Sequence, residues 1–282
     1  MKRAPLQVTD LHHIKLCYSK DRYCGHPRQC GIHNFGNGEI AVLHHHAHSS
    51  YENREDIRHG WDSRGYKSRC KILLQRSLDQ GETWNSENDV VVWDYDRPLE
   101  AHRNVLWKCD DPADPRANID LTSPDSAIYF GRPLTGRENE DGVPTMECLV
   151  WRSGDRGQTW ETSPCSRIKP PLGYSYVHVD CYPPARFEDG TVLVPATADN
   201  RNTGGSVSRS QLERFNQSVT VLYGSEDNGL SWHYVSEVMR DPTGHGRPVY
   251  ANLLVLPSGR LQCYVLNAGG VRTALHLNHS DD

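Results

Sequence analysis

The chain has 282 residues, of which 36% are hydrophobic, and its formal net charge is −5. This charge gives no reason to expect nucleic acid or an anionic membrane surface as a partner, and no apolar run approaches the ~20 residues of a membrane-spanning helix. The first eight residues start basic but are followed by no apolar core, so we expect no cleavable signal and a cytoplasmic location.

The cysteines number 9, stand at irregular spacing and form no C-x-x-C pair. Neither a zinc knuckle nor a thioredoxin-type site is therefore indicated. Several cysteines fall inside strand-like runs, which favours reduced and mostly buried thiols. Nothing in the sequence calls for a cofactor, and we expect none.

The first repeating unit is predicted from four short strands and the loops between them. Its strands are expected as two around a glycine turn within 35–43 and two more at 70–75 and 89–93. A lead-in strand is also expected before the unit, at residues 12–17. A polar loop at 49–68 separates the second strand from the third. Four short strands per unit are typical of a propeller blade.

Later stretches repeat this order with some irregularity. The second unit has strands at 126–130 and 148–151 around a charged loop, the third has strands within 181–194 and at 219–223, and a fourth opens at 250–261. The 7 tryptophans and 13 tyrosines supply apolar bulk in an otherwise polar chain. This composition suits a toroid of small sheets better than a single deep core.

One eight-residue motif, S-x-D-x-G-x-[T/S]-W, occurs three times, as Ser77–Trp84, Ser153–Trp160 and Ser225–Trp232. Each copy follows a strand-like run, and self-similarity at a regular interval indicates a repeated supersecondary unit. The aspartate can accept backbone hydrogen bonds, the glycine tolerates positive φ, and the hydroxyl residue can bond back across the turn. Tryptophan is then expected to begin the next strand. We interpret the motif as a structural turn between strands.

The motif resembles the Asp-box, or bacterial neuraminidase repeat, of the sialidase superfamily. That resemblance implies an all-β, six-bladed, sialidase-like β-propeller in which each box joins the third and fourth strands of a blade, away from the active site. It is more specific for fold than for activity, because other glycosidases, lyases and binding proteins carry the same boxes.

The last residues, Ser280–Asp282, supply S-x-D, the first three positions of a fourth box. We therefore expect one propeller domain over residues 1–282 that is truncated at its C-terminus and forms an incomplete ring of a little under four blades. A propeller needs ring closure, and an unfinished blade leaves an open edge. An open solenoid with a ragged end is the alternative.

The resemblance places an arginine that binds the substrate carboxylate ten residues before the glycine of the next turn, and Arg28 stands ten residues before Gly38. A planar guanidinium suits bidentate binding of a carboxylate. Gln29 and Cys30 replace the Ile-Pro that follows this arginine in the family. A structural ion pair is the alternative role for Arg28.

The family's acid/base aspartate lies in the loop before the third strand, which here holds Asp56 and Asp62. Asp62 follows Trp61 in a glycine-flanked segment that is more similar to the family context, and an apolar neighbour raises a carboxyl pKa as a general acid requires. We assign acid/base catalysis to Asp62 and substrate binding to Asp56. A turn residue is the alternative for Asp62.

Four histidines stand within residues 44–48, and on a strand His44, His46 and His48 share one face while His45 points the other way. Alternating histidines can bind a metal or act as a base near neutral pH. The local sequence adds no carboxylate or cysteine that completes a ligand set, so no metal is expected. His46 and His48 are the candidates for general base or substrate hydrogen bonding.

In the third unit, aromatic and polar residues alternate and would share one strand face. They are Tyr174, Tyr176, His178, Asp180 and Tyr182. Such a face suits stacking against a sugar, with His178 and Tyr182 as substrate-binding candidates, although packing between blades explains the tyrosines equally well.

Two residues of the family site are missing. The glutamate that partners the nucleophilic tyrosine and a second carboxylate-binding arginine would fall near Tyr250 and Leu266, and neither residue type is present there. Arg247 and Arg272 lie nearby and are candidate substitutes. The third arginine and the tyrosine would lie beyond the last residue.

Three functions follow from these residues. The first is a sialidase-like glycoside hydrolase acting on the terminus of an acidic glycan. The second is a propeller lyase or hydrolase of uronate-containing glycans that uses a histidine base. The third is a glycan-binding propeller without catalysis. The partner in each is a carbohydrate, and the first two are distinguished by the product, a saturated sugar or an unsaturated uronate.

Overall fold

A computed structural model of the chain describes residues 11–25, 31–49, 51–52, 70–95, 97, 101, 105, 108–131, 137–138, 144–179, 184–200, 218–244, 246–268 and 274–280. The regular elements of these residues are β1 (Arg22–Gly25), β2 (Ile32–Gly36), β3 (Glu39–His48), β4 (Cys70–Ser77), η1 (Ser86–Asn88), β5 (Val90–Asp94), η2 (Lys108–Asp110), β6 (Ala127–Gly131), β7 (Arg137–Glu138), β8 (Pro144–Thr145), β9 (Cys148–Ser153), β10 (Ser166–Ile168), β11 (Tyr176–His178), β12 (Ala185–Arg186), β13 (Val192–Asp199), β14 (Val219–Ser225), β15 (His233–Arg240), β16 (Arg247–Val255), β17 (Leu261–Ala268) and β18 (Ala274–His279).

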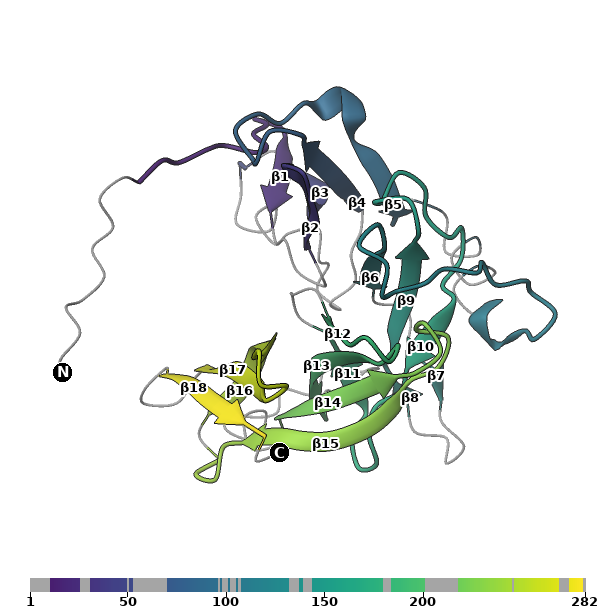
Figure 1. Cartoon of the computed structure of the whole chain (residues 1–282), viewed down its shortest axis with the longest axis vertical. Helices are drawn as coiled ribbons and strands as arrows, with labels where there is room; N and C mark the ends of the chain where they lie inside the picture. Colours follow the sequence, from purple (N-terminus) through teal and green to yellow (C-terminus); the bar gives the residue numbers. More distant parts are fainter. Residues whose placement is uncertain are drawn as a thin grey trace.

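Four small antiparallel sheets follow one another in a ring, as Figure 1 shows, and the predicted all-β propeller is confirmed. The first sheet has the order β1-β3-β4-β5 with β2 also on β3, and the second has the order β10-β9-β6. The third repeats the design of the first, β11-β13-β14-β15 with β12 also on β13, and the fourth is β16-β17-β18. A short β7–β8 pair stands apart from these four blades.

The innermost strand is in two pieces in both the first and the third blade. β1 and β2 pair with opposite ends of β3, and β11 and β12 pair with opposite ends of β13. The single strand expected over 174–182 is therefore wrong, because β11 ends at His178. The lead-in strand at 12–17 is also wrong: pairing with β3 begins only at Arg22, which lies opposite His48.

The three eight-residue turns have the same hydrogen bonds. In the first, Asp79 accepts from the backbone N–H and the hydroxyl of Thr83 at 2.9 and 2.5 Å, and Ser77 Oγ accepts from Gly81 N at 2.8 Å. The other two copies repeat these bonds around Asp155 and Asp227. The structural role that the sequence predicted for the aspartate and the hydroxyl residue is therefore confirmed.

Two details of the turns differ from the sequence prediction. The residue before the glycine also has positive φ, as at Gln80 (62°) and Arg156 (61°). The tryptophan does not begin a strand in the first copy, since β5 starts at Val90 after the short helix η1. Trp84 instead closes its turn, because its indole N–H donates to the Gly81 carbonyl at 2.8 Å.

Apolar side chains fill the space between neighbouring blades. Trp93 of the first blade packs on Trp151 of the second, with ring centroids 5.0 Å apart, and Tyr129 continues this cluster. A second cluster joins the second blade to the third and includes Phe130 and Val177. Among the described residues, no helix is long and apolar enough to cross a membrane.

Candidate functional site at the mouth of the ring

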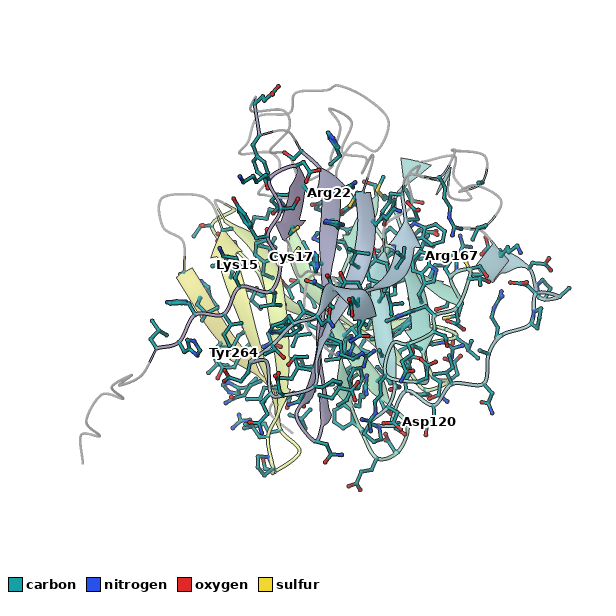
Figure 2. The ribbon with its side chains drawn as sticks, turned by 90° about the horizontal axis from the view of Figure 1, so that it is seen from above. Lys15, Cys17, Arg22, Asp120, Arg167 and Tyr264 are labelled. Carbon is teal, nitrogen blue, oxygen red and sulfur yellow. The ribbon has the colours of Figure 1, made fainter. Side chains whose placement is uncertain are left out.

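Each of the first three blades has a turn end, where an eight-residue turn begins, and an opposite end. β4 runs from Cys70 to the first turn at Ser77, and its antiparallel neighbour β3 places His48 at the opposite end. β13 likewise has Val192 beside the third turn and Asp199 at its other end. We call this opposite end the mouth end. Figure 2 labels Arg22 at the mouth end and Asp120 near the turns.

The histidine face predicted for β3 is confirmed by the strand register and by burial. His45 is 3% exposed and lies opposite Ile72, in the core. On the other face His44 is buried and its Nε2 lies 2.9 Å from Gln75 Oε1, while His46 is half-buried and His48 exposed. His44 is therefore held by Gln75, and His46 and His48 lie progressively nearer the mouth end.

The ionisation of His46 is shifted by its surroundings. Burial lowers the pKa of His46 below its ordinary value, and the neighbouring His44 and Arg22 lower it further. The imidazole is therefore neutral at pH 7, which is the form that acts as a base or as a metal ligand.

His178 lies at the mouth end of the third blade, on the short strand β11. It is 2% exposed, and its ring packs against Tyr176 with centroids 4.9 Å apart. Tyr176 lies opposite Asp199 in the ladder with β13. The sequence left sugar stacking and packing as alternatives for this face, and its described strand residues, Tyr176 and His178, are buried by packing.

Arg247 joins the third and fourth blades at the mouth end. Its Nη2 lies 3.1 Å from Oδ2 of Asp199, which is 3% exposed, whereas Arg247 itself is half-buried. Among the described residues, Nε of Arg247 has no hydrogen-bond partner. Asp199 thus orients the guanidinium, and the unpartnered Nε is itself buried.

The remaining predicted site residues lie outside the described residues and stay predictions. They are Arg28, Asp56, Asp62, Tyr182 and Arg272. Asp199 was missed by the sequence analysis, although it stands where a strand-like run enters a polar loop. Cys17 and Cys24 were also missed as neighbours of His46, because the pairing of β1 with β3 places Cys24 opposite His46 and the segment before β1 brings Cys17 to both.

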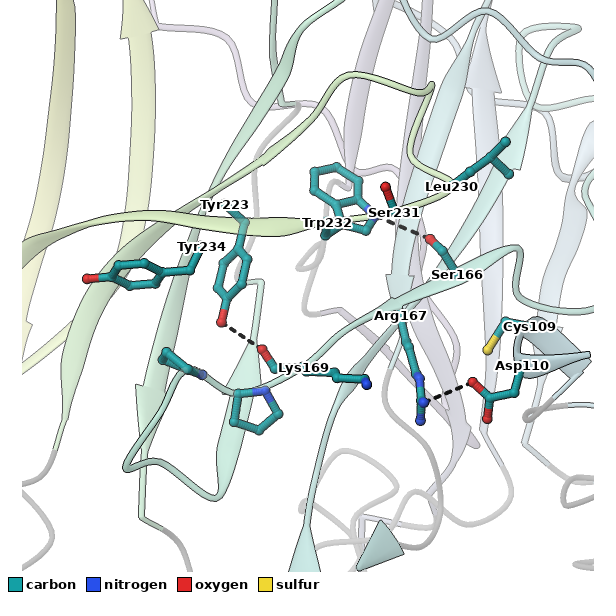
Figure 3. A pocket seen from close by; sticks show the side chains of 12 residues that line it. Cys109, Asp110, Ser166, Arg167, Lys169, Tyr223, Leu230, Ser231, Trp232 and Tyr234 are labelled. Carbon is teal, nitrogen blue, oxygen red and sulfur yellow. Dashed lines mark hydrogen bonds and ion pairs between the residues drawn. The ribbon is translucent and has the colours of Figure 1, made fainter. Parts of the chain in front are cut away.

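A pocket of about 470 Å³ lies elsewhere, between β10 and the β14–β15 pair at the outer edges of the second and third sheets (Figure 3). Its Arg167 is paired with Asp110 at 3.0 Å and with Glu147 at 2.8 Å. Trp232, the last residue of the third turn, also lines it. Because it adjoins this turn and its arginine is already paired, we do not place the candidate site there.

The order of the strands and the ring of sheets define the class of the protein as a β-propeller. Similar solved structures include a protein of unknown function from Dyadobacter fermentans, with 16% sequence identity and a TM-score of 0.57, over 94% of this chain and 67% of that one. Another is the leech intramolecular trans-sialidase complexed with 2,7-anhydro-Neu5Ac, with 13% identity and a TM-score of 0.50.

The second similarity covers 97% of this chain and 53% of the leech protein, so the chain spans about half the length of that structure. At such low identity these similarities show the fold alone. No protein-family model and no curated protein sequence matches the chain.

Proposed function

We propose that the protein is a glycoside hydrolase of the sialidase type that acts on the terminus of an acidic glycan. The propeller ring supports this proposal, as do the three turns, whose sequence resembles the Asp-box and which all lie at one end of the blades. The leech trans-sialidase, which shares the fold, was solved with 2,7-anhydro-Neu5Ac bound.

The arrangement of Arg247 is the observation that carries the proposal. Asp199 is buried and holds one side of the guanidinium, so the side chain is oriented before any ligand arrives. The side chain of Arg247 is 28% exposed, and a planar guanidinium binds a carboxylate better than the ammonium group of lysine does. An acidic sugar would be recognised by its carboxylate at this point, where the third and fourth blades meet.

The other residues of the proposed site have separate roles. Arg28 is the first carboxylate clamp, Asp62 the acid that protonates the leaving oxygen, and Asp56 a substrate-binding residue. Tyr182 and Arg272 complete the proposed substrate-binding set. In this chemistry the transition state resembles an oxocarbenium ion, and the acid acts on the glycosidic oxygen.

A second candidate is a lyase for uronate-containing glycans, favoured by the exposed imidazole of His48 at the mouth end of β3. In that reaction His48 would take the proton from the carbon next to the carboxylate while Arg28 neutralises the charge. The glycosidic oxygen on the neighbouring carbon would leave and take a proton from water, so that a C=C bond forms between the two carbons. The product is an unsaturated uronate that absorbs in the near ultraviolet, whereas hydrolysis of a sialoside releases a saturated sugar.

The test is a panel of α-sialosides and uronate-containing oligosaccharides, analysed by product, with wild type, Arg247→Ala, Arg247→Lys and Arg240→Ala. Arg240 is the matched control, because its ion pair with Glu237 is exposed on β15. We expect the wild type to hydrolyse the sialosides. Arg247→Ala should lose roughly 2–5 kcal/mol of transition-state binding, Arg247→Lys should recover part of that loss, and Arg240→Ala should hydrolyse them as the wild type does. An unsaturated product would favour the lyase, and binding without turnover would contradict both enzymes.

A further inference from the structure

Two cysteines and a histidine converge at the edge of the first blade. Cys24 on β1 lies directly opposite His46 on β3, so the two side chains project from the same face of the sheet. Cys17 comes from the segment before β1 and lies beside that strand in Figure 2. The two sulfurs and a ring nitrogen of His46 all lie within 4.8 Å of one another.

We propose that Cys17, Cys24 and His46 form a binding site for Zn²⁺, a role separate from the proposed glycoside hydrolysis. Zinc binds thiolate sulfur at about 2.3 Å and imidazole nitrogen at about 2.0–2.1 Å, so tetrahedral ligands lie roughly 3.5–3.8 Å apart. The observed cluster reaches that spacing with small side-chain adjustments. All three side chains are half-buried, which shields the site while leaving it accessible to an ion.

The types of the three ligands select the metal. Two thiolates and one imidazole suit zinc, whereas calcium and magnesium require oxygen ligands. Two thiolates also neutralise the charge of a divalent cation, so the bound site carries no net charge. Three protein ligands leave the fourth tetrahedral position to water or a small ligand.

The site would fasten the segment before β1 to the first sheet. Residues 11–19 contain no strand, and the sulfur of Cys17 lies within 4.8 Å of a ring nitrogen of His46 on β3. Metal ligands that are distant in sequence stabilise a fold because the site does not exist in the unfolded chain. The proposal also removes His46 as a free base and leaves that role to His48.

The test uses the full chain, purified under reducing conditions, freed of metal with a chelator and titrated with Zn²⁺ or Co²⁺. We expect one ion per chain, a higher melting temperature with Zn²⁺, and the near-ultraviolet charge-transfer band of thiolate-bound cobalt. Cys17→Ser, Cys24→Ser and His46→Ala should each weaken zinc binding at least 10-fold, by analogy with losses for ligand-orienting residues. Cys109→Ser is the matched control, because Cys109 is a half-buried thiol away from the cluster.

Two outcomes would overturn the proposal. One is zinc binding that is as tight in all three variants as in the wild type, or that is weakened as much in Cys109→Ser as in those variants. The other is a Cys17–Cys24 disulfide in the protein as isolated, combined with no zinc uptake after reduction, which would make the pair a redox couple. Metal binding is measured without substrate, so failure of the glycoside hydrolase proposal would leave this result unaffected, and Arg247→Ala should bind zinc as the wild type does.

Discussion

Arg152 donates from Nη1 to the main-chain carbonyl of Asn228 across 2.8 Å, which ties the second blade to the turn of the third. Arg76 makes the same contact one blade earlier, from Nη2 to the carbonyl of Arg156, also at 2.8 Å. Each arginine immediately precedes the serine of its own turn, and each acceptor is the fourth residue of the next turn. The repeated motif therefore connects neighbouring blades as well as neighbouring strands.

Removing Arg152 should destabilise the protein strongly. Its side chain is 1% exposed and is paired with Glu161 at 2.7 Å, so Arg152→Ala leaves a carboxylate unpaired in a buried place. We expect a loss of about 3–5 kcal/mol in the free energy of unfolding, measured by urea denaturation. Arg240→Ala, at an exposed pair, should cost no more than about 1 kcal/mol. Equal losses in the two variants would contradict this role for Arg152.

The turns should contribute to stability without contributing to ligand specificity. Asp155→Ala removes the acceptor of the hydrogen bonds from Thr159, and we expect a loss of about 1–2 kcal/mol. Gln158→Ala is the control, since Gln158 is an exposed residue at a variable position of the same turn. Melting temperatures and a glycan-binding panel measure the two properties. A variant of unchanged stability but altered specificity would show that the turn belongs to the binding site.

The acid dependence of stability follows from the same turns. Hydrogen bonds from the Thr83 hydroxyl and backbone, and then from Ser77, lower the pKa of Asp79 from 3.8 to about 2. The folded state thus binds fewer protons than the unfolded state between these values, so the contribution of Asp79 is complete above about pH 4 and is lost as the pH falls towards 2. Urea denaturation across this range should show a smaller pH dependence in Asp79→Asn than in wild type. An identical slope in both proteins would rule out this contribution.

Local patterns predicted the turns well, and long-range pairing explains what the sequence left undetermined. Ser77 and Asp79 are two residues apart, so their hydrogen bonds are encoded within one short motif. Arg247 and Asp199 are brought together by the packing of β16 on β13, which no local pattern contains. Cys24 meets His46 only because β1 pairs with the far end of β3.

The strand boundaries also depended on context. The alternation at 174–182 is typical of one strand, yet pairing with β13 stops at His178 and resumes at Ala185. The interruption corresponds in position to the one between β1 and β2, so the two blades share an irregularity that alternation alone does not encode.

The final prediction concerns Arg28, the residue whose spacing best matches a carboxylate clamp. If Arg28 binds the substrate carboxylate away from water, Arg28→Ala leaves that charge unpaired. We expect a loss on the order of 2–5 kcal/mol in transition-state binding. Lysine should restore only part of it, because an ammonium group does not reproduce the planar fork of the guanidinium.

A substrate series separates a clamp from a structural arginine. Substrates with the carboxylate reduced or esterified should be poor for the wild type and lose little further in Arg28→Ala, whereas loss of a structural arginine would reduce activity on charged and neutral substrates alike. The measurement is kcat/KM for both substrate types in wild type, Arg28→Ala and Arg116→Ala, a control whose partner Asp114 lies two residues away in the 111–116 segment. If the wild type processes charged and neutral substrates equally well, the acidic-glycan specificity is wrong, because no interaction with the carboxylate then distinguishes the two.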